Sequence, residues 1–246
     1  VAPDAKADAR RQALESVRAG GFGPREVVIR VNGLDTPWGA DDLAAARAAR
    51  PDAVLAPKVS SAREASAYAA VLGPDLPLWV MIETCTALFC LDEIVKAAPS
   101  LRALVLGTND LAKEMRCRLD VDRATLASAL TLTVAAGRAA GVTVLDGVYN
   151  DIEDASGLAR QCRQAVDFGF DGKSLIHPSQ IEAANRAFTP APAEVAWSRT
   201  VVAAFDSTEN AGKGVIKVEG RMVERLHLAE ARRLIAVAEA IAAREA

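Results

Sequence analysis

The fold is indicated most clearly by residues 76–84, which read LPLWVMIET. This stretch is apolar from Leu76 to Ile82, without polar residues at alternate positions, and it ends in Glu83 and Thr84. A short apolar run without alternation is typical of a strand that is buried on both faces, as in a parallel sheet. We therefore expect residues 76–84 to form an inner strand of such a sheet.

Similar apolar runs recur along the chain, separated by longer stretches with helical periodicity. The predicted strands are residues 27–32, 53–59, 76–84, 103–107, 142–148 and 172–176. The predicted helices are residues 4–18, 40–50, 62–72, 88–98, 123–141 and 153–169. The strands start about every 25 to 40 residues, which is the length of a βα unit. The pattern predicts an α/β fold with repeated crossovers.

The number of strands narrows this fold class further. A closed (β/α)8 TIM barrel has eight strands, whereas this chain opens on a helix and shows six. We expect a TIM barrel that lacks its first two strands in this chain. An open, doubly wound sheet is the alternative.

The pattern changes after Phe188, where Thr189-Pro190-Ala191-Pro192 reads as a hinge. A helix at residues 193–205 is predicted to follow, then a polar loop at residues 206–220 that contains the short strand VIKV. A long helix is predicted for residues 223–243. We expect a barrel domain at residues 1–188 and a C-terminal extension at residues 189–246.

Composition excludes several classes of protein. Of the 246 residues, 51% are hydrophobic and 25% are charged, with a net charge of -3, so the chain is neither disordered nor a general nucleic-acid-binding surface. No apolar run is long enough for a membrane span. The start at Val1 lacks the layout of a signal peptide, and the four cysteines form no C-x-x-C pair. We expect a cytoplasmic protein with reduced thiols.

Polar residues stand at the carboxyl ends of the predicted strands, where barrel active sites form. They are Arg30 with Asn32, Lys58, Glu83, Asp110, Asp146 and Lys173. Glu83 and Asp110 follow consecutive strands, whose backbones lie ~5 Å apart. Two neighbouring carboxylates suit Mg²⁺, which binds one or two carboxylates and leaves positions for water and substrate. The alternative is that they are helix N-caps or ion-pair partners of Lys58 and Arg30.

Arg30 adds a candidate for anion binding in the same cleft. Its planar guanidinium can hold a carboxylate through two parallel hydrogen bonds. A divalent metal beside an arginine suits a 2-oxo acid, because the metal can chelate the carboxylate and the oxo group. Polarising that carbonyl would promote the making or breaking of the adjacent carbon-carbon bond.

Six motifs occur together in the order and spacing of one family. They are IRVNG at residues 29–33, PKV at 57–59, IET at 82–84, GTNDL at 107–111, DGVYND at 146–151 and GKSLIHPSQI at 172–181. With them the chain resembles the citrate lyase beta-subunit-like (CitE-like) group of the HpcH/HpaI aldolase superfamily, which includes malyl-CoA lyases. The opening VAPDAKADAR also resembles that family, in which it follows the second barrel strand.

The resemblance implies a role for individual residues. It implies that Glu83 and Asp110 hold magnesium and that Arg30 binds the oxo-acid carboxylate. Substrate is expected to contact Glu83 and the backbone of residues 107–109, which are Gly107, Thr108 and Asn109. The segment GVIKVEGRMVERLHL at residues 214–228 resembles the lid of the family, which covers the active site of a neighbouring subunit. Glu224 then takes the place of the proton donor, where the usual residue is Asp.

These implications predict a Mg²⁺-dependent carbon-carbon lyase. It would cleave or form a 3-hydroxyacyl-CoA, such as malyl-, citramalyl- or citryl-CoA, with acetyl-CoA and a 2-oxo acid as products. The predicted assembly is a homotrimer or hexamer, without nucleic-acid or membrane partners. Two different activities are also compatible with the motifs, namely the citryl-ACP lyase subunit of a multienzyme citrate lyase and a metal-dependent pyruvate aldolase.

Overall fold

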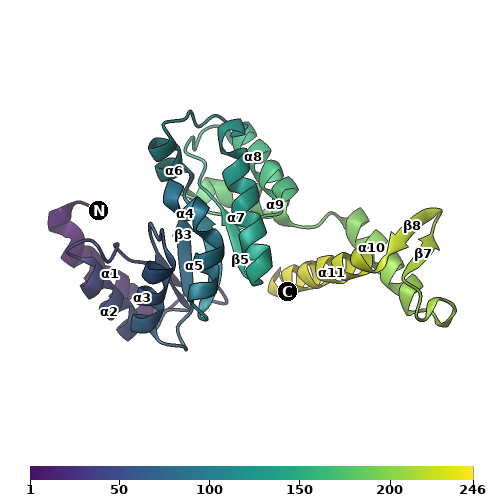
Figure 1. The fold of residues 1–246 in the computed structure, drawn as a ribbon, viewed down its shortest axis with the longest axis horizontal. Coiled ribbons are helices and arrows are strands. Elements are labelled where there is room, and N and C mark those ends of the chain that lie inside the picture. The colour runs from purple at the N-terminus through teal and green to yellow at the C-terminus, as the bar shows by residue number, and fades with distance from the viewer. Residues whose placement is uncertain (246) are drawn as a thin grey trace. The chain divides into compact units, whose positions relative to one another are not determined.

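The computed structural model describes residues 1–245, which divide into two compact units, one of residues 1–184 and one that starts at Asn185. The first unit contains a six-stranded sheet with helices packed against it (Figure 1). The strands are β1 (Val28–Arg30), β2 (Ala53–Ala56), β3 (Leu78–Ile82), β4 (Leu101–Leu106), β5 (Thr143–Asp146) and β6 (Gly172–Lys173). All six predicted strands are therefore present, each shorter than predicted or shifted by a few residues.

The six strands are parallel and lie in chain order, β1 to β6. A doubly wound sheet requires a reversal of strand order, so that alternative is wrong for this chain. Because every strand runs in the same direction, all the carboxyl ends meet at one edge of the sheet. Trp79, Val80 and Met81 of β3 pair with residues 103–105 of β4, which places Glu83 beside Gly107.

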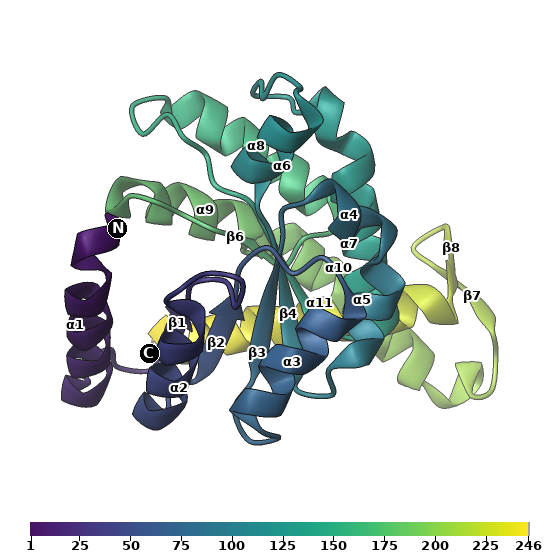
Figure 2. The same cartoon turned by 60° about the vertical axis from the view of Figure 1, so that its left-hand side comes forward.

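Helices connect the strands and form the outer layer. They are α1 (Lys6–Ala19), α2 (Gly39–Ala49), α3 (Ala62–Leu72), α4 (Cys85–Phe89), α5 (Leu91–Ala97), α6 (Thr108–Met115), α7 (Ala127–Ala140), α8 (Ala155–Phe168) and α9 (Ile181–Phe188). Successive helices α1, α2, α3, α5, α7 and α8 contact one another in that order. Figure 2 shows α2, α3 and α5 beside strands β1 to β4.

Apolar residues of the strands form the core, since Val54, Leu78, Ile82 and Leu104 are fully buried between the sheet and these helices. Side chains cap several of the helices at the strand ends. Thr84 accepts a hydrogen bond from Ala87 N at 3.1 Å and starts α4 directly after β3. Such capping fixes where the chain leaves the sheet.

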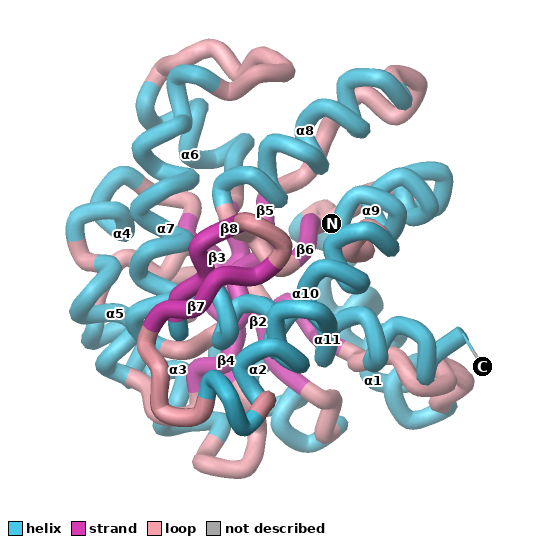
Figure 3. Tube along the Cα trace, turned by 90° about the vertical axis from the view of Figure 1, so that its right-hand side faces the viewer, coloured by secondary structure: helices cyan, strands magenta, loops and turns pink. Residues whose placement is uncertain are grey.

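The second unit has a hydrophobic cluster of its own. Its elements are α10 (Pro192–Asp206), the antiparallel strands β7 (Val215–Val218) and β8 (Arg221–Glu224), and α11 (Arg225–Glu245). Figure 3 shows β7 and β8 as paired magenta strands. The buried cluster consists of Val201, Phe205, Ile216, Val218, Val223, Leu228 and Ala231. The prediction of a helix from residue 223 is wrong at its start, because residues 221–224 pair with β7 and the helix begins at Arg225.

Candidate active site

The carboxyl edge of the sheet brings together four charged residues. Arg30 ends β1, Lys58 follows β2, Glu83 follows β3, and Asp110 lies in the first turn of α6 after β4. Their charges act on one another, since those of Asp110, Lys58 and Arg30 each shift the pKa of Glu83. Glu83 and Asp110 line one cleft, as predicted, whereas Arg30 lies at the same edge of the sheet but lines a separate pocket with Asn32 and Asp42.

Glu83 is a buried carboxylate, with only 4% of its surface exposed. Burial raises its pKa above the ordinary value, because it disfavours the charged form. The backbone N–H of Lys58 donates to Glu83 Oε1 at 2.9 Å and partly offsets this effect. A positive charge bound at Glu83 would also favour the ionised form, so the site is suited to a cation.

Lys58 can donate this hydrogen bond because of its unusual backbone. Its φ is +52°, in the left-handed region that residues with a side chain rarely adopt. Such conformations cost about 1 to 3 kcal/mol and occur often at functional sites. Here the conformation is associated with a backbone N–H directed at the buried carboxylate.

Gly107 allows Glu83 to approach strand β4 closely. A Cβ atom added at Gly107 would lie 2.6 Å from Glu83 Oε2 and would also overlap Glu83 Cβ. Gly107 N donates to Ile82 O at 2.9 Å, which continues the ladder between β3 and β4 to the position of Glu83. A side chain at residue 107 would therefore displace the carboxylate.

Asp110 lies at the mouth of the same site and is more exposed than Glu83. Its Oδ1 atom lies 3.1 Å from Lys58 Nζ. Both carboxylates open onto a cleft of about 360 Å³. The cleft is lined by Lys58, Glu83, Thr84, Asp110, Lys113, Glu114 and Arg116.

For Glu83 and Asp110, the alternative to metal binding was a role as helix N-cap or as ion-pair partner. They are not helix N-caps, because Thr84 precedes α4 and Gly107 precedes α6 in those positions. The ion-pair interpretation is confirmed for Asp110, which contacts Lys58. Glu83 instead accepts a hydrogen bond from the backbone of that residue.

The two carboxylates fit a hard divalent cation. Within residues 1–245, no group of three or more His, Cys, Asp or Glu side chains is placed to hold a metal ion. Two carboxylates are nevertheless enough for Mg²⁺, which keeps several water or substrate ligands. The ammonium group already in contact with Asp110 indicates that this carboxylate attracts positive charge.

Residues 107–109 are held in place by their neighbours across the sheet edge. The side chains of Asn109 and Asn150 exchange two hydrogen bonds of 2.9 and 2.7 Å, which join the turn after β4 to the loop after β5. Thr108 is 1% exposed and lies against Gly147, where an added Cβ would approach Thr108 Oγ1 to 2.6 Å. Thr108 as a whole residue, backbone included, is therefore buried within this chain. The substrate-binding role of residues 107–109 stays a prediction.

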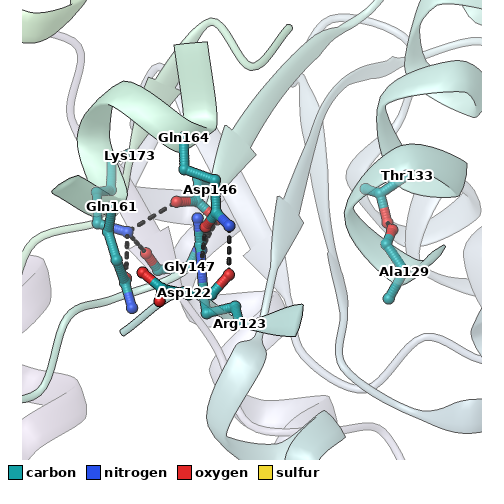
Figure 4. A network of polar contacts seen from close by, with 9 residues as sticks. All are labelled: Asp122, Arg123, Ala129, Thr133, Asp146, Gly147, Gln161, Gln164 and Lys173. Atoms are coloured by element: carbon teal, nitrogen blue, oxygen red, sulfur yellow. Dashed lines mark hydrogen bonds and ion pairs between the residues drawn. The ribbon is translucent and has the colours of Figure 1, made fainter. Parts of the chain in front are cut away.

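A buried charged network lies under the loop that follows β5 (Figure 4). Asp146 Oδ1 accepts a hydrogen bond from Arg123 at 2.6 Å, and Oδ2 accepts one from Lys173 at 2.7 Å. The side chains of all three are at most 1% exposed. Lys173 also contacts Gln161 at 3.4 Å, and Arg123 contacts Gln164 at 2.9 Å.

Sequence reasoning identifies Asp146 and Lys173 as strand-end residues but misses Arg123. The helix predicted for residues 123–141 starts too early, since Arg123 has a φ of +50° and the helix α7 begins at Ala127. Burial lowers the pKa of Lys173, and the charge of Asp146 opposes that effect. One aspartate therefore balances two buried cations at this edge of the sheet.

Glu224 belongs to the C-terminal unit, where it is the last residue of β8. Its side chain is half-buried, and its backbone N donates to His227 Nδ1 at 2.9 Å. The strand and this hydrogen bond fix the start of α11 at the next residue. The catalytic role of Glu224 stays a prediction.

Comparison with known proteins agrees with the fold. The sequence model of the HpcH/HpaI aldolase/citrate lyase family matches residues 1–178. The chain belongs to this family. The matched part contains Arg30, Glu83 and Asp110 together with the six strands.

Two relatives and one crystal structure are similar to this chain over nearly its whole length. A (3S)-malyl-CoA thioesterase of Cereibacter sphaeroides is 48% identical over 99% of this chain and 85% of its own length. An L-malyl-CoA/beta-methylmalyl-CoA lyase of the same species is 32% identical over 99% of this chain and 86% of its own length. The crystal structure of CitE from Mycobacterium tuberculosis in complex with magnesium, acetoacetate and coenzyme A is 30% identical, with a TM-score of 0.79. It covers 97% of this chain and 86% of the CitE chain.

Two further expectations concern the cofactor and a membrane span. Magnesium, the predicted cofactor, is bound in a solved protein of the same family. In the part of the chain that the structure describes, no helix is both long and apolar enough to cross a membrane.

Arg30→Lys is expected to weaken binding of a 2-oxo acid. Lysine keeps the charge but loses the planar fork that grips a carboxylate. In the condensation direction we expect the KM for the oxo acid to rise about tenfold, which corresponds to a loss of about 1.4 kcal/mol. Arg30 forms no ion pair within residues 1–245, so stability should change little. An unchanged KM would show that Arg30 does not bind the carboxylate.

Proposed function

We propose that this chain is a Mg²⁺-dependent enzyme that acts on malyl-CoA or a similar 3-hydroxyacyl-CoA. The observation that supports this most directly is the pair of Glu83 and Asp110 in one cleft, with Arg30 at the same edge of the parallel sheet. Relatives named for activity on malyl-CoA extend over nearly the whole chain. A carboxylate pair and a free guanidinium are the groups that such a substrate requires.

The proposed roles follow from the chemistry of each group. Glu83 and Asp110 would hold Mg²⁺, which supplies Lewis acidity to substrate oxygens. Arg30 would bind the substrate carboxylate at the end of β1. Gly107 leaves room for Glu83, and the Lys58 N–H holds that carboxylate in its orientation. The backbone at residues 107–109 would then lie against the acid part of the substrate.

Thioester hydrolysis is the outcome that the comparisons favour. The relative at 48% identity is named a thioesterase, and the relative named a lyase is 32% identical. In hydrolysis, water attacks the thioester carbon, the C–S bond breaks, and the products are the free acid and coenzyme A. Hydrolysis and carbon-carbon cleavage would start from the same bound ester. They would differ only in which bond breaks.

Carbon-carbon cleavage, the reaction predicted from the sequence, is the second candidate. It is favoured by the lyase relative and by the family to which the chain belongs. Cleavage of malyl-CoA would give acetyl-CoA and glyoxylate. Activity as a citryl-ACP lyase subunit or as a pyruvate aldolase can be tested on the same protein with the corresponding substrates.

Product analysis with malyl-CoA and Mg²⁺ tests the proposal. Hydrolysis is expected to release free thiol and malate in equal amounts, with neither acetyl-CoA nor glyoxylate. Acetyl-CoA and glyoxylate in equal amounts would instead identify a lyase. Citryl-CoA, citryl-ACP and a free 4-hydroxy-2-oxo acid complete the panel. Turnover of citryl-ACP or of the free 4-hydroxy-2-oxo acid, with both CoA esters unchanged, would contradict the proposal.

We further propose that the C-terminal unit acts as a lid in a cytoplasmic homo-oligomer, a trimer or hexamer. In this arrangement Glu224 would serve the active site of a neighbouring subunit as proton donor or acceptor. Its position after β8, in a unit with its own hydrophobic cluster, supports a fixed orientation of the carboxylate within that unit.

Glu224→Gln is expected to remove most activity, since the amide cannot exchange the proton. If the carboxylate acts in trans, unfolding and refolding this variant together with inactive Asp110→Asn should restore part of the activity. Mixed oligomers would then contain sites with an intact metal centre from one chain and Glu224 from another. A mixture that stays inactive would refute the trans geometry. A fully active Glu224→Gln protein would refute the catalytic role itself.

A further inference from the structure

Lys58 contacts both proposed metal ligands, but through different parts of the residue. Its backbone N–H donates to Glu83 Oε1 at 2.9 Å, and its ammonium group lies 3.1 Å from Asp110 Oδ1. The two contacts differ in mobility. The backbone contact is fixed by the chain that follows β2, whereas the side chain is 62% exposed and can swing on its four-carbon stem.

The ammonium group and a divalent cation would compete for the same carboxylate. Two carboxylates at neighbouring strand ends repel each other, and a positive charge near them relieves that repulsion. Lys58 supplies this charge at Asp110. A divalent cation bound between Glu83 and Asp110 would take over the carboxylate oxygen and would repel the ammonium group.

We propose that Lys58 is a tethered cation that leaves Asp110 when a divalent metal binds and then faces the anionic part of the ligand. The inference rests on the proposed metal site and gives the Lys58 side chain a role in ligand binding. The backbone contact to Glu83 does not involve the side chain, so Glu83 stays in place during this movement.

The charges of the site support the second half of the proposal. Counted at their formal charges, the two cations Arg30 and Lys58 balance the two carboxylates Glu83 and Asp110. A divalent cation and one substrate carboxylate would together add one positive charge. That excess matches one negative charge developing on the ligand. Without Lys58 the same site would have no excess charge to offer.

Isothermal titration with Mg²⁺ alone tests the first half, using the wild-type chain, Lys58→Met and Lys58→Arg. Methionine keeps an unbranched stem, so the left-handed backbone is under the same constraint as with lysine. We expect Lys58→Met to bind Mg²⁺ about fivefold more tightly, the upper end of what an exposed ion pair contributes. Lys58→Arg should remain close to wild type because it keeps the charge.

Lys113→Met is the matched control. Lys113 lines the same cleft, and within residues 1–245 it forms no ion pair with either carboxylate. Its removal alters the net charge by the same amount and should change Mg²⁺ affinity clearly less than Lys58→Met. If both variants changed Mg²⁺ affinity equally, the loss of one positive charge from the cleft would explain the result. The specific role of Lys58 would then be overturned.

Titration with pyruvate at saturating Mg²⁺ tests the second half. Here we expect Lys58→Met to bind about fivefold more weakly than wild type, the opposite sign to its effect on the metal. A merely structural role would weaken both ligands. Unchanged or weaker Mg²⁺ binding would overturn the proposal, and so would pyruvate binding that stays as strong as in wild type. If the wild-type chain binds no Mg²⁺, the proposed metal site itself is wrong.

Discussion

Asp110→Asn is expected to lower Mg²⁺ affinity and turnover by about a hundredfold or more, while the fold stays intact. The amide has the shape of the carboxylate but no charge. The expected loss corresponds to about 3 kcal/mol of Mg²⁺ binding free energy. Asp110 is partly exposed and its ion-pair partner is the exposed side chain of Lys58, so its loss should hardly affect folding. Mg²⁺ titration calorimetry and turnover at increasing Mg²⁺ would measure both effects.

Glu114→Gln provides the control for this variant. Glu114 lines the same cleft, is exposed, and accepts a hydrogen bond from Cys85 N at 3.1 Å. The Glu114→Gln substitution removes one negative charge from the same cleft without removing a proposed metal ligand. Mg²⁺ affinity should therefore stay within a few-fold of wild type. Near-normal turnover of Asp110→Asn without added metal would show that the site is wrong.

Asp146→Asn is expected to lower the free energy of unfolding by about 3 to 5 kcal/mol. The substitution leaves the cations of Arg123 and Lys173 buried without their shared counter-charge, and breaking one partner of a buried ion pair has a cost of this order. Asp146 Oδ1 also accepts from Gly147 N at 2.8 Å, which an amide oxygen can still do, but the amide nitrogen would face the Lys173 ammonium in place of Oδ2. Urea unfolding followed by circular dichroism would measure the change.

Asp92→Asn is the matched surface substitution. Asp92 pairs with Lys96 one turn away at 2.7 Å, and both side chains are more than 70% exposed. Its effect should stay within about 0.5 kcal/mol. If Asp146→Asn were as stable as this control, the buried network could not depend on the charge of Asp146.

The sequence allowed prediction of the strands and of three charged residues at their ends, for one physical reason. Strands buried on both faces need nearly continuous apolar runs, so a charged residue directly after such a run marks a strand end. Glu83 and Asp110 are identified in this way, and the parallel topology then brings them to one edge. Arg30 follows from the same argument at the end of β1.

Other features depend on packing that no local pattern reveals. Arg123 is fully buried because Asp146 and Gln164 reach it from elements 23 and 41 residues away. The ion pair between Lys58 and Asp110 was only one of the roles that the sequence left open for that carboxylate. For β8 the sequence offered Gly220 as a turn residue between VIKV and RMVE, and in the structure Glu219 and Gly220 both have positive φ in a two-residue turn there. Such turns are typical of hairpins, and this one places Glu224 in a strand.

The hydrophobic cluster of the C-terminal unit has a consequence for divergence within the family. The family match ends at residue 178, and the seven buried side chains from Val201 to Ala231 pack against one another beyond it. Substitutions among these seven side chains can accumulate while the sheet and its carboxylates keep their packing. The two parts of the chain can therefore evolve at different rates. A shared metal site could then be retained while the fate of the bound ester changes from one member to another.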